Sequence, residues 1–247
     1  MFQPASLKGE SPVPVDERIR RALLPLYYLI IIMSFFPISI LEYYYILVLW
    51  QDSFYFIFLL LFPLNIFVVL HLLQLSALII AGLILKIVNL IHAPKEGIFN
   101  RDIKDKEYSF WNIRNIIKKW PLYLTSSNPF PWWKNRFALR FFGVEIGKHS
   151  IVDNSWLSSE FLKVGKNVIL GMNSTAITFG IEQDKFFIKE ILIEDDVLIG
   201  AKCSILPGTH IKRGVKVAAY SYTDFNEILE EYKLYGGHPA KLITDLK

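Results

Sequence analysis

Two acidic side chains, Glu182 and Asp184, lie two positions apart in the polar segment 179–185. A carboxylate can take the proton of an attacking hydroxyl or amine if burial raises its pKa toward neutral pH. We therefore interpret Glu182 and Asp184 as candidate general bases. Burial cannot be read from a sequence, so the alternative is that both are solvated loop carboxylates.

Histidine suits proton transfer because its unperturbed pKa is near 6.5. His149 is a candidate because it precedes Asp153 by four residues, although a surface turn residue is the alternative. We interpret His210 as another turn residue. His238 lies near the C-terminus, and we do not interpret it as a catalytic residue.

Several classes of site are excluded by what the sequence lacks. The single Cys203 and the scattered histidines have no ligand spacing typical of zinc, so we expect no metal. No Gly-rich phosphate loop is present, which argues against dehydrogenases and NTPases. The basic residues flank apolar runs instead of forming a basic face with stacking aromatics, so we expect no nucleic acid partner.

A six-residue repeat beyond residue 143 predicts the element that positions these side chains. Of eleven positions, only Ser158 is neither aliphatic nor Ala; the other ten are Ile146, Val152, Val164, Leu170, Ala176, Ile193, Ile199, Ile205, Ile211 and Val217. Strands alternate with period two and helices with 3.6, so a period of six predicts short strands joined by turns. Each hexad would form one side of a coil with its aliphatic side chain inside. The interruption between Ala176 and Ile193 contains Glu182 and Asp184, and sites are often built on such excursions.

The residues after the repeat predict a short helix. Asp224 could cap its N-terminus with Glu227 three positions later, and Gly236-Gly237 would end it. The sequence Gly-His-Pro-Ala-Lys-Leu follows at 237–242.

Two apolar runs without charge, 22–41 and 53–85, precede the repeat and are long enough to span a bilayer. Their connector carries Glu42 and Asp52 but no Lys or Arg, whereas both outer flanks are basic. The positive-inside rule places both flanks in the cytoplasm, so we expect two crossings. A break near residues 63–65 would instead divide the second run into two short helices. The first run lacks a small-residue cleavage site, so we expect it to remain as an anchor.

Between the runs and the repeat, residues 108–142 mix Trp with Lys and Arg. Such a segment could lie along the lipid headgroups or form a helical collar on the next domain. We therefore expect three regions: a transmembrane region (1–107), an interfacial helical linker (108–142) and a repeat domain (143–247).

The repeat resembles that of the hexapeptide-repeat acyltransferases, and residues 237–241 resemble the Gly-x-Pro-Ala-Lys/Arg signature that closes their repeat domain. This resemblance implies a left-handed parallel β-helix, a homotrimer and acetyl-CoA or another acyl-CoA as co-substrate. It also implies that His238, Pro239, Ala240 and Lys241 lie beside the coenzyme.

A finer resemblance links the apolar pairs, residues 108–111 and residues 139–147 to the membrane-embedded C-terminal region of ε-poly-lysine synthetases and related nonribosomal-peptide-like proteins. It implies that Asp153 and Glu160 contribute to substrate binding. Many of these relatives have a His at the start of the excursion as the general base. This sequence has Gly180 there, which puts the base in doubt.

The predicted fold is a two-helix transmembrane hairpin followed by a left-handed parallel β-helix with a short C-terminal helix. The predicted function is a membrane-anchored acyltransferase that modifies a hydroxyl or amine of a membrane-proximal acceptor. We expect an integral membrane protein in the lipid bilayer, with the β-helix domain and both termini cytoplasmic. The alternative is a catalytically inactive trimeric membrane scaffold, or an assembly subunit, that retains the β-helix.

Overall fold

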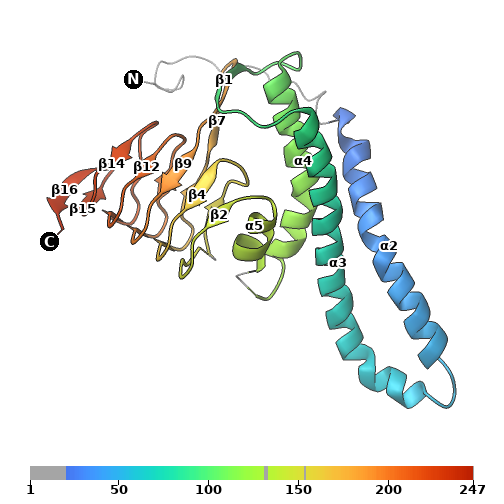
Figure 1. Ribbon diagram of the computed structural model, residues 1–247. Coiled ribbons are helices and arrows are strands. Elements are labelled where there is room, and N and C mark those ends of the chain that lie inside the picture. Colours follow the sequence, from blue (N-terminus) through green and yellow to red (C-terminus); the bar gives the residue numbers. More distant parts are fainter. Residues whose placement is uncertain (1–20, 131–132, 153, 247) are drawn as a thin grey trace. The chain divides into compact units, whose positions relative to one another are not determined.

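The computed structural model describes residues 21–130, 133–152 and 154–246 (Figure 1). Their contacts divide the chain into two compact units. One, the helical unit, contains residues 21–93 and 112–127. The other, the coiled unit, contains residues 94–111 and the described residues from 128 onward.

The helical unit is built on a hairpin of α2 (Leu24–Leu49) and α3 (Tyr55–Ile91). Helix α3 is continuous through Pro63, so the second apolar run forms one helix rather than two. Asn65 donates a hydrogen bond to Glu42 across the hairpin at 2.8 Å, and the Tyr45 hydroxyl donates to the Phe58 carbonyl. The unit also contains residues 112–126 of α4 (Lys106–Ser126).

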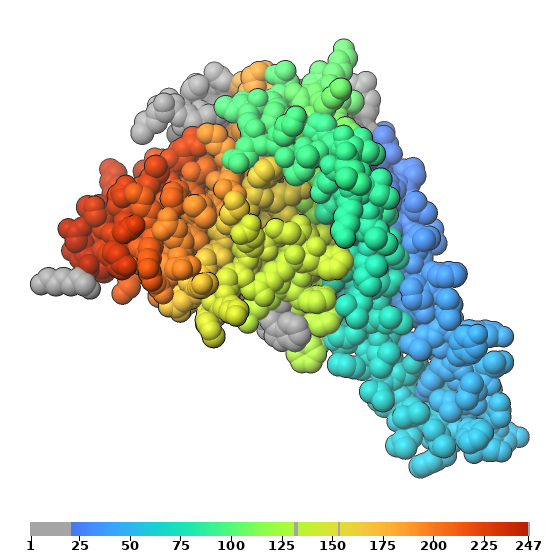
Figure 2. All heavy atoms as spheres, in the orientation of Figure 1, coloured from blue at the N-terminus to red at the C-terminus, as the bar shows by residue number. Residues whose placement is uncertain are grey.

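The hairpin, which runs from blue to cyan in Figure 2, has an unusually apolar surface. The buried side chains of α2 are Ile30, Ser34 and Ile38, which share one helix face. On the other faces of the two helices, large apolar side chains are exposed. Phe56, for example, is 76% exposed. A water-soluble surface rarely presents apolar patches of this extent. By length and composition, both helices can cross a membrane.

The coiled unit consists of short parallel strands stacked on three sides. We name its sides stack B, stack C and stack D. Stack B contains β2 (Glu145–Ile146), β4 (Leu162–Val164), β9 (Ile191–Ile193), β12 (His210–Ile211) and β14 (Ile228–Leu229). Stack C contains β5 (Ile169–Leu170), β10 (Leu198–Ile199), β13 (Lys216–Val217), β15 (Lys233–Gly236) and the antiparallel β16 (Lys241–Asp245). Stack D contains β3 (Trp156–Leu157), β6 (Thr175–Ala176) and β11 (Ser204–Ile205).

The predicted interior positions are confirmed. All ten aliphatic or Ala positions of the repeat are buried, and Ile146 is the most exposed of them at 6%. Vertical neighbours are 18 residues apart in the later coils, as in the pairing of Ile193 with Ile211 and of Ile211 with Leu229. Three hexads therefore make one coil.

A second interior position, two residues before each of these, was missed. Its members include Ser150, Val168, Ser174, Val197, Cys203, Thr209 and Val215, all at most 1% exposed. Strand side chains alternate between faces, so residues i and i−2 point inward together. Ser158 is the one position of the repeat that is neither aliphatic nor Ala. Leu157 pairs with Ala176 in its place, and the Ser158 hydroxyl accepts a hydrogen bond from the Thr178 N–H at 3.0 Å.

The predicted C-terminal helix is wrong, because residues 224–236 continue the coil. Thr223, Leu229 and Tyr235 extend the six-residue phase beyond Val217, and all three are buried. The Asp224 N–H does donate to the Glu227 carboxylate at 2.6 Å, as in a helix cap. Here that contact closes a turn, because strand pairing with the coil above outweighs the local helix signal.

The first coil is covered by the π-helical turn η2 (Trp133–Ala138) and α5 (Leu139–Phe141). Buried Asn135 donates to the carbonyls of Val152, at 2.5 Å, and Ser155, at 2.9 Å. Arg136 donates to the Ser150 carbonyl and Arg140 to the Ile146 carbonyl. These contacts satisfy backbone groups at the open end of the solenoid, where an uncovered edge would invite pairing with other strands.

We expect Asn135→Ala to destabilise this end of the coiled unit by about 1–3 kcal/mol, because it removes a buried donor from the Ser155 carbonyl and from the Val152 carbonyl, the second of which still accepts from the Ser155 hydroxyl. Hydrogen exchange of residues 144–157 should accelerate in this variant. The exposed Asn154 lies on the same coil, and Asn154→Ala should change stability by less than about 0.5 kcal/mol. Equal exchange in the two variants would contradict the capping role.

Candidate functional site

The excursion, residues 177–190, leaves the solenoid after stack D and returns at the start of stack B. It forms the hairpin β7 (Phe179–Glu182) and β8 (Lys185–Ile188). A third strand, β1 (Gly97–Asn100), pairs antiparallel with β8. Arg101 secures the tip, because its N–H donates to the Asp184 carbonyl at 2.7 Å and its guanidinium donates to the Gln183 carbonyl at 3.0 Å.

Aromatic side chains anchor the excursion in the coiled unit. Phe186 is fully buried, with its ring centroid 4.5 Å from that of Trp111 and 5.2 Å from that of Tyr108. The Trp111 ring also lies 4.8 Å from Phe179. The excursion is therefore a packed substructure. Its pairing with residues 97–100 was not predicted, because no local pattern joins segments so far apart in the sequence.

Gly180 lies directly under an aromatic ring. It pairs with Phe187 across the hairpin, and a Cβ atom added to Gly180 would be 2.0 Å from Phe187 Cζ. Phe187 is 7% exposed and contacts Phe225 edge to face at 5.0 Å. The Phe187 ring therefore fills the space that a histidine side chain at position 180 would occupy.

The predicted acidic residues lie around the excursion. Glu182 is partly exposed at the end of β7, while Asp184 is in the turn, 70% exposed and 3.5 Å from Lys185 Nζ. Glu160 lies at the base of the excursion, where its carbonyl accepts a hydrogen bond from the Thr178 hydroxyl. Asp153 is outside the described residues.

The other predicted residues lie at different edges of the solenoid. His149 is an exposed turn residue with φ of 62° between stacks B and C. The closing motif, residues 237–241, follows stack C in the last coil. There the Ala240 N–H donates to the Tyr222 carbonyl at 2.7 Å, and the His238 ring lies 5.6 Å from the Tyr222 ring. Pro239 lies between them, and Lys241 is exposed. Within one chain, His149, the excursion and the closing motif are thus not brought together.

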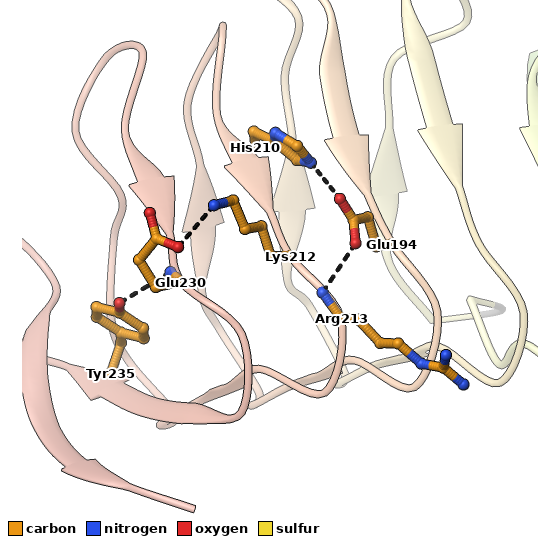
Figure 3. Close-up of polar contacts among 6 residues, drawn as sticks. All are labelled: Glu194, His210, Lys212, Arg213, Glu230 and Tyr235. Carbon is orange, nitrogen blue, oxygen red and sulfur yellow. Dashed lines mark hydrogen bonds and ion pairs between the residues drawn. The ribbon is translucent and has the colours of Figure 1, made fainter.

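A polar network that was not predicted lies on the outer face of stack B (Figure 3). His210 Nε2 is 2.6 Å from Glu194 Oε1, and the other oxygen of Glu194 accepts the Arg213 backbone N–H at 3.1 Å. Lys212 pairs with Glu230 at 2.6 Å. The Glu230 N–H donates to the hydroxyl of Tyr235, a buried residue of stack C. His210 is therefore a strand residue rather than the turn residue we expected. The repeat contained a signal for this network, since residues flanking each interior position must point outward and stack in columns.

A hollow of about 440 Å³ lies on the same face. Its lining includes Glu145, Lys163, Leu192, Glu194 and Arg213. Lys163 forms an ion pair with Glu190 at 2.8 Å, and this hydrogen bond raises the pKa of Lys163. The hollow thus combines cationic, anionic and apolar groups. Among the described residues, no group of three or more His, Cys, Asp or Glu side chains could hold a metal ion.

Glu227, at the edge between stacks D and B, should make stability depend on pH. Burial raises the pKa of Glu227, although the Asp224 N–H bound to its carboxylate opposes this. The folded state then holds this proton more tightly than the unfolded state, so stability falls as pH rises through the window above the ordinary value of 4.5. We expect Glu227→Gln, which keeps an acceptor for that N–H, to melt above the wild type at pH 7 and level with it near about pH 4. A melting difference that does not vary with pH would contradict this.

Comparisons with known proteins agree with this architecture. The family described as "Hexapeptide repeat of succinyl-transferase" matches residues 190–222. The Bacillus subtilis (strain 168) protein named "Putative acetyltransferase YvoF" is 30% identical over 135 residues, which cover 53% of this chain and 76% of YvoF.

Two solved structures show weaker likeness. The acetyltransferase VCA0836 from Vibrio cholerae, complexed with acetyl coenzyme A, is 28% identical with a TM-score of 0.40, over 42% of this chain and 61% of that one. A galactoside acetyltransferase in complex with coenzyme A is 17% identical with a TM-score of 0.44, over 53% and 79%. The family assignment depends on YvoF and on the buried six-residue repeat. The chain belongs to the hexapeptide-repeat acyltransferases.

Proposed function

We propose that this protein is a membrane-anchored, coenzyme A-dependent acyltransferase that moves an acetyl or related acyl group to a hydroxyl or amine of a membrane-proximal acceptor. The observation that carries the proposal is the match to YvoF, together with a six-residue repeat whose interior positions are buried. Because residues 237–241 resemble the closing signature of the family, we place the coenzyme beside His238, Pro239, Ala240 and Lys241. In this proposal the β-helix is left-handed. The finer resemblance to ε-poly-lysine synthetases also stays a prediction.

The apolar surface of α2 and α3 supports the membrane anchor. With 37 residues, α3 is about 56 Å long. It therefore exceeds the hydrocarbon core of about 30 Å, so part of it extends into the interface or cytoplasm. Tethering raises the effective concentration of a membrane-held acceptor at the site. Reporters fused at residues 51 and 100 should lie on opposite sides of the membrane; reporters on the same side would refute the hairpin topology and a cytoplasmic coiled unit.

A homotrimer would explain why the predicted site residues lie at separate edges of one chain. Clefts between adjacent solenoids would combine the excursion of one copy with the closing motif or His149 of another. Glu160 and Asp153 would then contribute to acceptor binding, and Glu182, Asp184 and His149 are candidates for removing the proton. Light scattering of the detergent-solubilised protein should give three chains per particle; a monomer would contradict this arrangement.

The direct test is incubation of the purified protein with radiolabelled acetyl-CoA and a membrane lipid extract. We expect label in the lipid or lipid-linked fraction, and free coenzyme A as the second product. Glu182→Gln and Asp184→Asn keep the side-chain shapes while removing the charges. Unchanged turnover in both variants would eliminate these carboxylates as the base.

A second candidate function is a non-catalytic membrane scaffold that uses the β-helix for assembly. The observation that favours it is Phe187, which fills the position of the missing histidine at Gly180. Binding of acetyl-CoA without turnover, measured by calorimetry beside the transfer assay, would support the scaffold over the enzyme.

A further inference from the structure

We propose that the outer face of the helical segment 133–141 is a docking surface for anionic lipid headgroups, which holds the first coil of the solenoid against the bilayer. We call this surface the collar face; its side chains are Trp133, Lys134, Phe137, Arg140, Phe141 and Trp156. The proposal rests on the membrane anchor of the proposed function. It adds a second attachment to the membrane and an orientation for the coiled unit.

The segment 133–141 packs on the solenoid with one side and leaves the other side open. Asn135, Ala138 and Leu139 are at most 1% exposed and share the side that covers the first coil. Phe137 and Phe141 lie four residues apart on the opposite side, where they are 36% and 44% exposed. Large apolar side chains grouped on an open surface mark an interaction site.

Trp156 extends the collar face from the solenoid itself. It lies in β3 of the first coil and is 61% exposed, and Lys134 Nζ lies 4.2 Å from the centre of its ring. On the helical segment, the Trp133 and Phe137 rings stack with their centroids 4.8 Å apart. Aromatic rings beside Lys and Arg are typical of membrane-interface anchors, since the rings lie at headgroup level and the cations reach the phosphates.

The charge of this part of the chain has one sign. Residues 108–144 contain six Lys or Arg and no Asp or Glu. Arg136 and Arg140 donate to backbone carbonyls of the first coil, which are neutral. Neither they nor Lys134 form an ion pair with a carboxylate of the described residues. Their positive charges therefore remain available to a lipid phosphate.

Charge and chain connectivity favour a lipid surface over a second copy of this protein. Two copies that met through the collar face would bring like charges together, whereas headgroup phosphates carry the opposite charge. The segment also follows the helical unit closely, because six residues separate the end of α4 from the start of η2. Such a short tether to an anchored unit gives the collar face a high effective concentration at the bilayer.

Docking through the collar face defines which acceptors the coiled unit can reach. The excursion follows β6, and β6 pairs directly with β3 of the first coil. Neighbouring strands are about 4.8 Å apart, so the excursion begins one such step from the coil that lies on the headgroups. An acceptor with its reactive hydroxyl or amine in the headgroup itself fits this arrangement.

The test uses the full-length protein in nanodiscs of phosphatidylglycerol with a nickel-chelating lipid. A nitroxide is attached at Phe141→Cys; the native Cys203 is buried, so the introduced cysteine takes the label. The control label is at Ile228→Cys, which is 56% exposed on β14, four strand steps or about 19 Å from β2. We expect the nickel lipid to accelerate spin relaxation strongly at position 141 and weakly at position 228.

A charge reversal tests the electrostatic part. In the Phe141→Cys background, we expect Lys134→Glu to reduce the nickel effect at least about threefold at low ionic strength, where surface charges are least screened. Replacing phosphatidylglycerol by neutral phosphatidylcholine should reduce it in the same direction without any further substitution. Lys216→Glu is the matched control, because Lys216 is exposed on stack C and makes the same change of charge elsewhere on the solenoid.

Three results would count against the proposal. A position-141 label that the nickel lipid does not affect, in protein retained in the nanodisc, would refute docking and leave the membrane anchor and acyl transfer standing. Broadening between labels at position 141 without a nickel effect would assign this face to a second copy instead. Protein that is not retained in the nanodisc would refute the membrane anchor of the proposed function, and the docking with it.

Discussion

Ile205→Ala is expected to lower the free energy of unfolding of the coiled unit by about 2–5 kcal/mol, the usual range for a buried aliphatic side chain. Ile205 is fully buried in β11, in line with Ala176 of the coil above. Because Ala176 belongs to another coil, closing the cavity would require whole coils to shift toward each other. Hydrogen exchange of the peptides spanning residues 190–222 should report the loss.

The matched control for this substitution is Ile228→Ala. Ile228 belongs to the same solenoid, but its side chain points outward and is 56% exposed. It should change stability by about 0.5 kcal/mol or less. Similar effects of the two substitutions would mean that every sixth residue does not line a packed interior.

The second large effect is expected at Gly180. Because a Cβ atom there would lie 2.0 Å from Phe187 Cζ and 2.2 Å from Cε2, Gly180→Ala must displace the ring from its contact with Phe225. We expect a cost of about 1–3 kcal/mol, typical of overpacking. Thermal unfolding of the purified protein should show the corresponding decrease in melting temperature.

A double-mutant cycle separates this clash from other effects. Phe187→Ala alone should cost about 3–5 kcal/mol, because the ring is buried. In the double variant, the added methyl group enters space that the ring has vacated, so the combined cost should be smaller than the sum of the two. Additive costs would show that the ring does not cover Gly180.

Some features of the site had a signal in the sequence that was not used. The repeat defines outward columns as well as inward ones, and these columns place Leu192 beside His210 and Glu194 beside Lys212. The sequence pattern therefore implies a polar face on stack B. The contact between His210 and Glu194 depends on side-chain rotamers, however, which no spacing specifies.

Other features compete with a local signal or have none. Asp224 and Glu227 form the cap-like contact expected of a helix start, yet Leu229 and Tyr235 continue the coil. Burial of two interior side chains and pairing with the strands above favour the coil over the helix. The joining of β1 to β8 is a non-local antiparallel pairing, and such pairings are not encoded in any window of neighbouring residues.

The sequence alone determined the apolar helices and the stacked coils, because both depend on regularly spaced apolar side chains that must be removed from water. It also determined the family, through the repeat. Only the tertiary structure decided which side chains meet: Phe187 over Gly180, Arg101 at the excursion tip, and Glu194 with His210. The physical reason is that burial sets the fold through a pattern along the chain, whereas a site depends on distances between residues that the pattern leaves far apart.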